Sequence, residues 1–282
     1  MEKSKRFAHI LRKLKFDKIQ DIPISNSPVE GFYCYNDQKY LCDTYLDSII
    51  SGGFNAFDFS SNNLDPFSLT VQLYSKGECK HYQGSPLEHF YNSWQPQTLA
   101  QVAGLPTPQE NHLLSAFPEN APPFPWDAGN VGSQRAVRLK KLPQHKVGLA
   151  NNPPRGFFYY GPVDVAFGEA TFNRLVNIYE SINCYGYQAN KYGDYIKARV
   201  LMKENKYRVF VRSGKHRIAV LRGMGYKKVP ILYGSSQNTP SIVRREDSFF
   251  WPNVISGFYS EMEALQIFER IFNGVAPVGL QL

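Results

Sequence analysis

The sequence predicts an α+β fold, with a domain of mixed helices and strands over residues 161–282. Three observations predict this class. A helical pattern precedes two alternating strand patterns, the second strand turns through a glycine into a short helix, and a further strand closes the unit. An N-terminal region over 1–105 is expected to add β-rich, aromatic structure, and a proline-rich segment over 106–160 joins the two parts.

The composition is that of a folded protein without a membrane span. Hydrophobic residues make up 43% of the 282 residues and aromatic residues 15%, which is enough for a sizeable core and excludes wholesale disorder. No apolar run approaches the roughly 20 residues that cross a bilayer. The N-terminus lacks the continuous apolar block of a secretory signal. We therefore expect a cytoplasmic protein.

The cysteines are expected to be reduced and buried. They show no C-x-x-C spacing, and disulfides are rare in the cytoplasm. A disulfide between Cys34 and Cys42, across a predicted hairpin, is the alternative. The set consists of Cys34, Cys42, Cys79 and Cys184.

The net charge of +8 favours acidic partners, and basic residues crowd the first eighteen positions. Within 3–18 the apolar residues are spaced three or four apart, which predicts a basic amphipathic helix. The first interpretation is a surface helix that docks its apolar stripe on the domain. The alternatives are an interfacial anchor, which would place the protein peripherally at the inner face of the membrane, and a nucleic-acid-binding arm. The apolar residues are Phe7, Ile10, Leu11 and Leu14, and the basic ones are Lys3, Lys5, Arg6, Arg12, Lys13, Lys15 and Lys18.

Local patterns predict the elements of the N-terminal region. Aromatic residues on both sides of Asn36-Asp37 suggest a hairpin over 32–42. Alternation over 68–75 suggests a strand that turns at Lys76-Gly77 into a second strand over 78–82. Ser85, followed by a proline and then by a glutamate, predicts a helix start.

The segment 106–160 contains nine prolines between positions 106 and 154, which forbid long helices and central strands. Phe117, Phe124 and Trp126 argue against a free linker. We expect this segment to wrap over the surface.

After Gly161 regular structure is expected again. The apolar spacing predicts a helix over 172–182 that ends at Gly186. Ser260 and Glu263 form a capping box that opens a helix running to position 272. The remaining predicted elements are strands over 196–202, 207–211 and 229–232 and a short helix over 218–222.

The chemistry is expected in the turn that joins the second of these strands to the short helix. Gly214 permits a turn that few side chains tolerate, and the first N–H groups of the helix attract an anion. Lys215 and Arg217 add full positive charges, and His216 can donate a hydrogen bond or move a proton near neutral pH. With Ser213 these residues form a candidate phosphate-binding loop. A turn of this kind that binds nothing is the alternative.

The candidate phosphate-binding loop and the residues after it resemble a known sequence motif, referred to below as the box. Residues 213–232, Ser-Gly-Lys-His-Arg-Ile-Ala-Val-Leu-Arg-Gly-Met-Gly-Tyr-Lys-Lys-Val-Pro-Ile-Leu, are similar to the G-x-H-R-x-x-A-x-x-x-x-G-x-x-x-V-P motif of the ParB/sulfiredoxin superfamily. The helix before it, with Ser181-Ile182 and Gly186, resembles the S-I-x-x-x-G ending of the preceding helix there. The resemblance covers about 162–233. Trp251-Pro252 and the helix 260–272 resemble a group of bacterial proteins with this domain that is associated with surface-polysaccharide gene clusters.

Departures from the pattern distinguish the branches of the superfamily. Sulfiredoxins carry a cysteine directly before the His-Arg pair, where this chain has Lys215, so the reductase reaction is not expected. ParB proteins carry a helix-turn-helix after the box, but only about fifty residues follow Tyr233, so specific DNA recognition is not expected. The remaining resemblance is to the free-serine kinases. It implies ATP or another nucleotide, Mg²⁺, and a carboxylate that activates an acceptor hydroxyl.

Three carboxylates are candidates for that role. Glu169 precedes the predicted helix and is the first choice as base, although it can equally be a favourable charge at a helix N-terminus. Asp164 is a candidate metal ligand, or else a turn residue. Asp194 is more typical of a turn, and Arg174 is a candidate phosphate contact or a solvated helical residue.

The resulting hypothesis is a nucleotide-dependent phosphotransferase (a kinase) that acts on a small hydroxyl compound, such as a sugar or glycan precursor. Its catalytic residues would be Glu169 and His216. A non-catalytic nucleotide-binding regulator or scaffold is the alternative. A nuclease or non-specific nucleic-acid binder is the second alternative, favoured only by the net charge and by the resemblance to ParB proteins.

Overall fold

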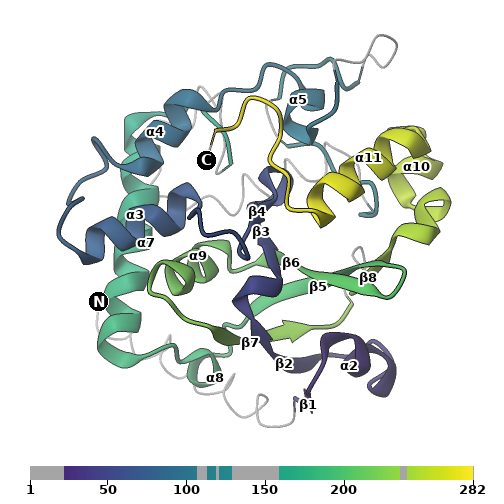
Figure 1. Cartoon of the computed structure of the whole chain (residues 1–282), viewed down its shortest axis with the longest axis horizontal. Helices are drawn as coiled ribbons and strands as arrows, with labels where there is room; N and C mark the ends of the chain where they lie inside the picture. Colours follow the sequence, from purple (N-terminus) through teal and green to yellow (C-terminus); the bar gives the residue numbers. More distant parts are fainter. Residues whose placement is uncertain (1–21, 107–112, 119–120, 129–158, 236–239, 282) are drawn as a thin grey trace, which may run out of the picture.

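The computed structural model describes residues 22–106, 113–118, 121–128, 159–235 and 240–281. Helices and one mixed sheet make up this part of the chain, which confirms the α+β class (Figure 1). The strands are β1 (Ile24–Ser25), β2 (Tyr40–Tyr45), β3 (Ile49–Ser51), β4 (Phe57–Asp58), β5 (Ile196–Lys203), β6 (Lys206–Ser213), β7 (Lys228–Tyr233) and β8 (Ile242–Arg244). The α-helices are α2 (Pro28–Cys34), α3 (Pro66–Ser75), α4 (Pro86–Ser93), α5 (Leu99–Ala103), α7 (Val165–Tyr185), α8 (Ala189–Tyr192), α9 (Lys215–Gly223), α10 (Pro252–Ile255) and α11 (Glu261–Phe272). Short 3₁₀ helices are η1 (Leu46–Ser48), η2 (Gly53–Asn55) and η3 (Arg245–Phe250).

The sheet joins both parts of the chain. Its order is β1-β2-β7-β5-β6-β3-β4, and β8 also pairs with β5. The antiparallel pair β5 and β6 places Val200 opposite Val209. Strands from the N-terminal region flank the C-terminal strands on both sides, because β2 runs antiparallel to β7 and β3 runs parallel to β6.

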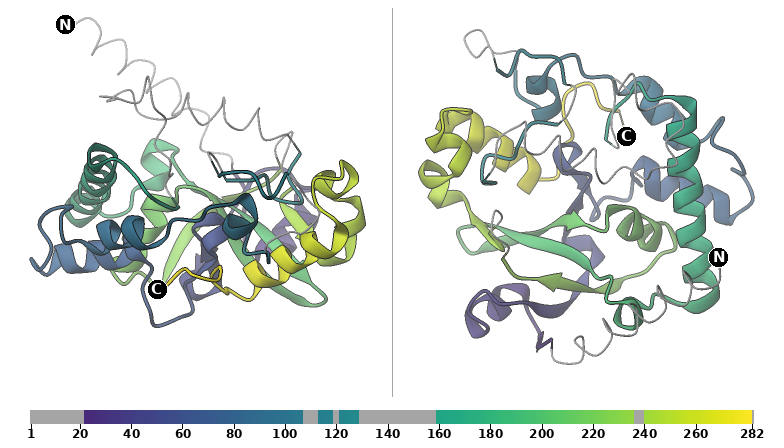
Figure 2. Two further views of the ribbon diagram at one scale, coloured as in Figure 1. Left: turned by 90° about the horizontal axis from the view of Figure 1, so that it is seen from above. Right: turned by 180° about the vertical axis from the view of Figure 1, so that it is seen from behind.

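Helix α9 packs against α3 and α7, and the three helices gather beside the sheet (Figures 1 and 2). Ile218 and Leu221 of α9 are fully buried. Gly223 sets the spacing between α9 and α3, because a Cβ at this position would lie 2.6 Å from the carbonyl oxygen of Ser68. The close approach therefore requires a residue without a side chain.

A buried arginine ties α9 to the loop before α3. The guanidinium of Arg222 lies 3.2 Å from a carboxylate oxygen of Asp65 and stacks over the ring of Phe59 at 4.3 Å. The same carboxylate caps α3 by accepting hydrogen bonds from the first backbone N–H groups of that helix. Arg222 also donates to three carbonyl oxygens of the loop, those of Asp58, Ser61 and Asn63.

Most predicted elements of the C-terminal part are confirmed. Helix α7 ends at Gly186, β5 and β6 form the expected hairpin, and the capping box of Ser260 and Glu263 opens α11. Two helices begin earlier than predicted. α7 starts at Val165, and α9 starts at Lys215, directly after the glycine.

The hairpin predicted over 32–42 is wrong in its first half. Residues 28–34 form helix α2 because Ser27 caps the first turn and Pro28 fits the first helical position. The polar turn is present, since Asn36 and Asp37 adopt left-handed backbone angles, but it follows a helix instead of a strand. The strand after it, β2, agrees with the prediction.

The strands predicted over 68–75 and 78–82 are also wrong. Residues 66–75 form α3, opened by Asp65 as N-cap and Pro66 at the first position, and no strand is present over 78–82. Small hydroxyl residues on the buried face of α3 made its sequence look alternating. The hydroxyls of Ser68 and Thr70 are satisfied within the helix by Asp65 and by the carbonyl of Pro66. The described N-terminal region is therefore more helical than expected.

Much of the proline-rich segment lies outside the described residues, as does the predicted helix 3–18. The described stretches 113–118 and 121–128 contain no helix or strand, and Trp126 is buried, whereas Phe117 is 46% exposed. The prediction of buried cysteines holds for Cys42 and Cys79 only. Cys34 and Cys184 are exposed, and all four are free thiols. In the described parts of the chain, no helix is both long enough and apolar enough to cross a bilayer.

The ion pair of Arg222 predicts a large effect on stability. Asp65→Ala should lower the free energy of unfolding by about 3–5 kcal/mol, because a buried guanidinium would lose its counter-ion. Ser260→Ala is the matched control, since it removes an N-cap side chain at an exposed helix start and should cost about 1 kcal/mol. Urea unfolding of both variants measures the difference. Equal losses would show that Arg222 does not depend on Asp65.

Candidate functional site

The turn from β6 into α9 has the backbone that the sequence predicted. Gly214 adopts φ +86°, and a Cβ there would approach the side chain and backbone of Ile196 to 3.0 and 3.1 Å. Both facts restrict the position to glycine. Gly214 is also the N-cap of α9 and supplies no side chain to the first turn. The N-terminus of this nine-residue helix therefore begins without a side-chain cap.

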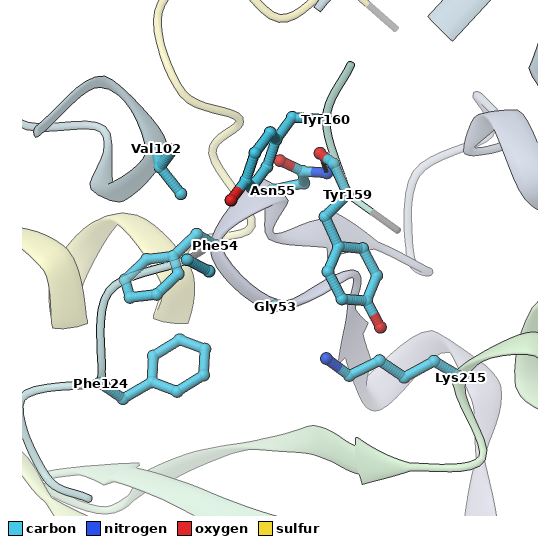
Figure 3. Close-up of a pocket in the computed structure, with 9 residues that line it drawn as sticks. Gly53, Phe54, Asn55, Val102, Phe124, Tyr159, Tyr160 and Lys215 are labelled. Carbon is cyan, nitrogen blue, oxygen red and sulfur yellow. Dashed lines mark hydrogen bonds between the residues drawn. The ribbon is translucent and has the colours of Figure 1, made fainter. Parts of the chain in front are cut away.

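Lys215 points from the first position of α9 toward the turn of η2 (Figure 3). Its ammonium lies 4.2 Å from the centre of the Tyr159 ring. It also comes within 3.5 Å of where a Cβ on Gly53 would lie, so the absence of a side chain at Gly53 keeps this approach open. The lysine ammonium thus lies between the face of the Tyr159 ring and the backbone of the η2 turn.

A small cavity of about 30 Å³ lies beside this lysine (Figure 3). Phe54 and Phe124 stack on one side of it, with ring centres 4.3 Å apart. Asn55 holds Tyr159 in place, since its amide donates to the Tyr159 carbonyl at 2.8 Å. The residues around the cavity are Gly53, Phe54, Asn55, Val102, Ala121, Phe124, Tyr159, Tyr160 and Lys215.

His216 is the second residue of α9 and is partly buried. Its ring packs against Phe67 of α3 at 5.9 Å between centres. Burial, together with the positive charges of Arg174 and Lys215, lowers the pKa of His216 to about 3. The imidazole is therefore neutral at neutral pH, where it can donate a hydrogen bond but does not carry an extra proton.

Arg217 is already engaged with a carboxylate. Its guanidinium lies 3.0 Å from Asp194, which is mostly exposed, so solvent weakens this pair. The arginine side chain itself is 19% exposed and passes within 3.2 Å of where a Cβ on Gly214 would lie. It therefore borders the turn. Ser213 is exposed at the end of β6.

Two further arginines add to the positive character of this region. Arg174 of α7 is close enough to His216 to affect its pKa. Arg212, at the end of β6, is partly buried. Burial and the neighbouring Arg199 lower its pKa to about 10, and Asp127 opposes this shift.

The two carboxylates predicted to take part in the chemistry, Glu169 and Asp164, belong to α7 and its N-cap, not to the glycine turn. Glu169 is exposed on α7, and its carboxylate accepts a hydrogen bond from Gln83 at 3.0 Å, on the side of α7 that faces the segment before α4. Asp164 is the exposed N-cap of α7 and makes no capping bond through its side chain. Among the described residues, no group of three or more His, Cys, Asp or Glu side chains could hold a metal.

Sequence reasoning missed the opposite wall of the cavity. Gly53 and its neighbour Gly52 both have positive φ, and this glycine pair was a signal for an unusual turn. Nothing in the local sequence connected the pair to Lys215, because the pairing of β3 with β6 brings them together. Tyr159 is likewise placed by tertiary structure.

The lowered pKa of His216 predicts a specific pH dependence. In the unfolded chain this histidine takes up a proton below about pH 6.5, whereas in the folded chain it does so only near a pKa of about 3. Its contribution to stability is therefore complete above about pH 6.5 and is lost as the pH falls toward 3. His216→Gln should remove this part of the acid sensitivity, measured by urea unfolding at several pH values. A His216 NMR signal that titrates near pH 6 would contradict the assignment.

Comparison with models of protein families, with curated proteins and with solved structures found no match.

Proposed function

We propose that the protein binds the phosphates of a nucleotide at the N-terminus of α9 and transfers a phosphoryl group to a small hydroxyl compound. One observation carries the proposal. A helix begins directly after a left-handed glycine without a side-chain cap, and it bears Lys215 and Arg217 in its first turn. The helix start and both cations favour the same kind of ligand, a group with several negative oxygens.

The two cations suit different parts of such a ligand. Lys215 is a compact charge beside the cavity, and a phosphate oxygen could replace its contact with the Tyr159 ring. Arg217 can grip two oxygens at once if it releases Asp194, whose exposed carboxylate is held weakly. The neutral His216 could add one hydrogen bond.

The size of the cavity limits what it could hold. A volume of about 30 Å³ is roughly two to three times the space that a single buried water requires. It can receive the oxygens of a phosphate but not a purine ring. The base and ribose of a nucleotide would therefore lie outside it.

The order of elements is also consistent with the resemblance to the ParB/sulfiredoxin superfamily. Helix α7, the hairpin of β5 and β6, the glycine turn, α9 and β7 follow one another as expected for that domain. Within the superfamily the resemblance is to the free-serine kinases. The association of similar proteins with surface-polysaccharide genes suggests a sugar or glycan precursor as the acceptor.

In the proposed reaction the acceptor hydroxyl attacks the terminal phosphorus of the nucleotide. The hydroxyl proton passes to a carboxylate, for which Glu169 is the candidate, and the bond to the nucleoside diphosphate breaks. For this step Glu169 must exchange its hydrogen bond with Gln83 for one with the acceptor. A bound Mg²⁺ would neutralise phosphate charge, with Asp164 as the candidate ligand on this chain.

A non-catalytic nucleotide-binding regulator is the second candidate. Two observations favour it: the carboxylate of Glu169 is occupied by Gln83, and His216 has a pKa too low to carry a proton at neutral pH. Binding would then use the same turn, without transfer.

Nucleotide binding is tested by thermal shift with and without magnesium. A nucleotide at 100 times its dissociation constant should stabilise the parent by roughly 2.7 kcal/mol. Lys215→Ala and Arg217→Ala should each weaken binding by about tenfold or more, as expected for a lost charge-assisted hydrogen bond. Lys228→Ala is the matched control, since this lysine also lies over a tyrosine ring, that of Tyr45 at 5.0 Å, but belongs to β7. Unchanged affinity in Arg217→Ala would contradict the site.

Catalysis is tested by following labelled phosphate from ATP into a pool of small metabolites. Glu169→Gln should reduce transfer by about 10²-fold or more, the usual contribution of a general base. Glu180→Gln is the control, because Glu180 is a carboxylate of the same helix that accepts a hydrogen bond from Tyr74. Nucleotide binding without transfer to any acceptor would favour the regulator.

A further inference from the structure

Four large apolar side chains are exposed close together in the C-terminal part of the sequence. The exposed fractions are 65% for Phe249, 71% for Phe250, 70% for Ile255 and 68% for Met262. Single exposed apolar residues are common on protein surfaces, but four within fourteen positions are a concentration that marks interaction surfaces. We refer to these four residues as the C-terminal apolar surface.

The elements that carry this surface are joined to one another. η3 packs against both α10 and α11, and the hydroxyl of Ser248 in η3 donates to Glu261 in the first turn of α11 at 2.7 Å. The rings of Phe249 and Phe250 lie edge to face, 5.5 Å apart. The three elements lie together on the side of the molecule away from α7 (Figure 1).

The exposure of these side chains follows from a well-packed local structure. Ser248 and Trp251, which flank the two phenylalanines, are buried. The indole of Trp251 packs against Phe268 of α11 and against Trp126. Because Ser248 and Trp251 are fixed in the core, the side chains of the two phenylalanines between them face the solvent.

The charges beside the surface are mainly acidic. Glu246, Asp247 and Glu261 are exposed, and the backbone of a further exposed glutamate, Glu204, donates to the Glu246 carboxylate. Arg245 and Lys203 share the carboxylate of Glu269, which neutralises these two cations only in part, but the four exposed carboxylates outnumber them. An apolar surface with acidic neighbours disfavours an anionic bilayer and favours a basic amphipathic partner.

The chain carries a segment with this complementary chemistry. Residues 3–18 contain seven lysines and arginines, with Phe7, Ile10, Leu11 and Leu14 spaced three or four apart. We propose that this N-terminal segment docks its apolar stripe on the C-terminal apolar surface, with its basic residues against the acidic neighbours. The charge pattern thus favours docking on the protein over the membrane anchor.

The attachment of the segment is compatible with this docking. The described chain begins at Ile22, and Tyr33 of the following α2 accepts a hydrogen bond from Arg244, the last residue before η3. The first part of the described chain is thus in contact with the strand that leads into the surface. A covalently attached segment also has an effective concentration of about millimolar, so modest contacts are sufficient.

The test is hydrogen–deuterium exchange of peptides from 3–18 in the full chain. These peptides should be protected in the parent, and Phe249→Asp with Phe250→Asp should raise their exchange by about tenfold. Leu11→Asp should have the same effect from the other side of the contact. Tyr185→Asp is the control, since Tyr185 is 72% exposed at the end of α7. Melting temperatures check that each variant remains folded.

Three outcomes would overturn the proposal. The first is absence of protection in the parent, and the second is protection that survives in the double variant. The third is protection that requires another partner. It would increase with protein concentration if the surface binds the segment of a second copy, or would appear only with vesicles of anionic lipid if the segment binds a membrane.

Discussion

The position of α9, and with it the candidate site, depends on the buried guanidinium of Arg222. This group joins the last turn of the helix to Asp65 and to three carbonyl oxygens of the loop before α3. Gly223 beside it lets α3 approach the helix closely. The C-terminal end of α9 is thereby clamped by a charged network whose groups are satisfied by the protein itself. The opposite end carries Lys215 and Arg217 in the first turn of the helix and begins without a side-chain cap.

This difference between the two ends is the physical basis of the proposed function. Asp65 neutralises the buried charge at the C-terminal end, whereas at the N-terminal end Arg217 is paired with Asp194, whose carboxylate is mostly exposed. Residual positive potential therefore collects where the helix dipole is also positive. Aromatic side chains around Lys215 reduce the access of water to that potential and strengthen its effect on an anion.

Local rules predicted the elements whose signals are self-contained. The capping box of Ser260 and Glu263 and the helix end at Gly186 are each decided by a few neighbouring residues, and the structure agrees with them. The failures came where two local signals competed. At α2 the aromatic residues favour a strand, whereas Ser27 and Pro28 favour a helix start, and the capped helix is the structure that forms. The glycine turn before α9 was predictable, but the opposite wall of the cavity was not, because tertiary contacts alone bring Gly53 and Tyr159 to Lys215.

The pairing of β3 with β6 has a consequence for the order in which the chain folds during synthesis. It joins Ile49 to Val209, positions separated by most of the chain, and the same closure brings the two walls of the cavity together. Contacts of such high contact order form late, after the entropy of a long loop has been lost. A nascent chain therefore has no cavity until synthesis has passed α9. Any ligand of that cavity would distinguish a finished molecule from a partly folded one.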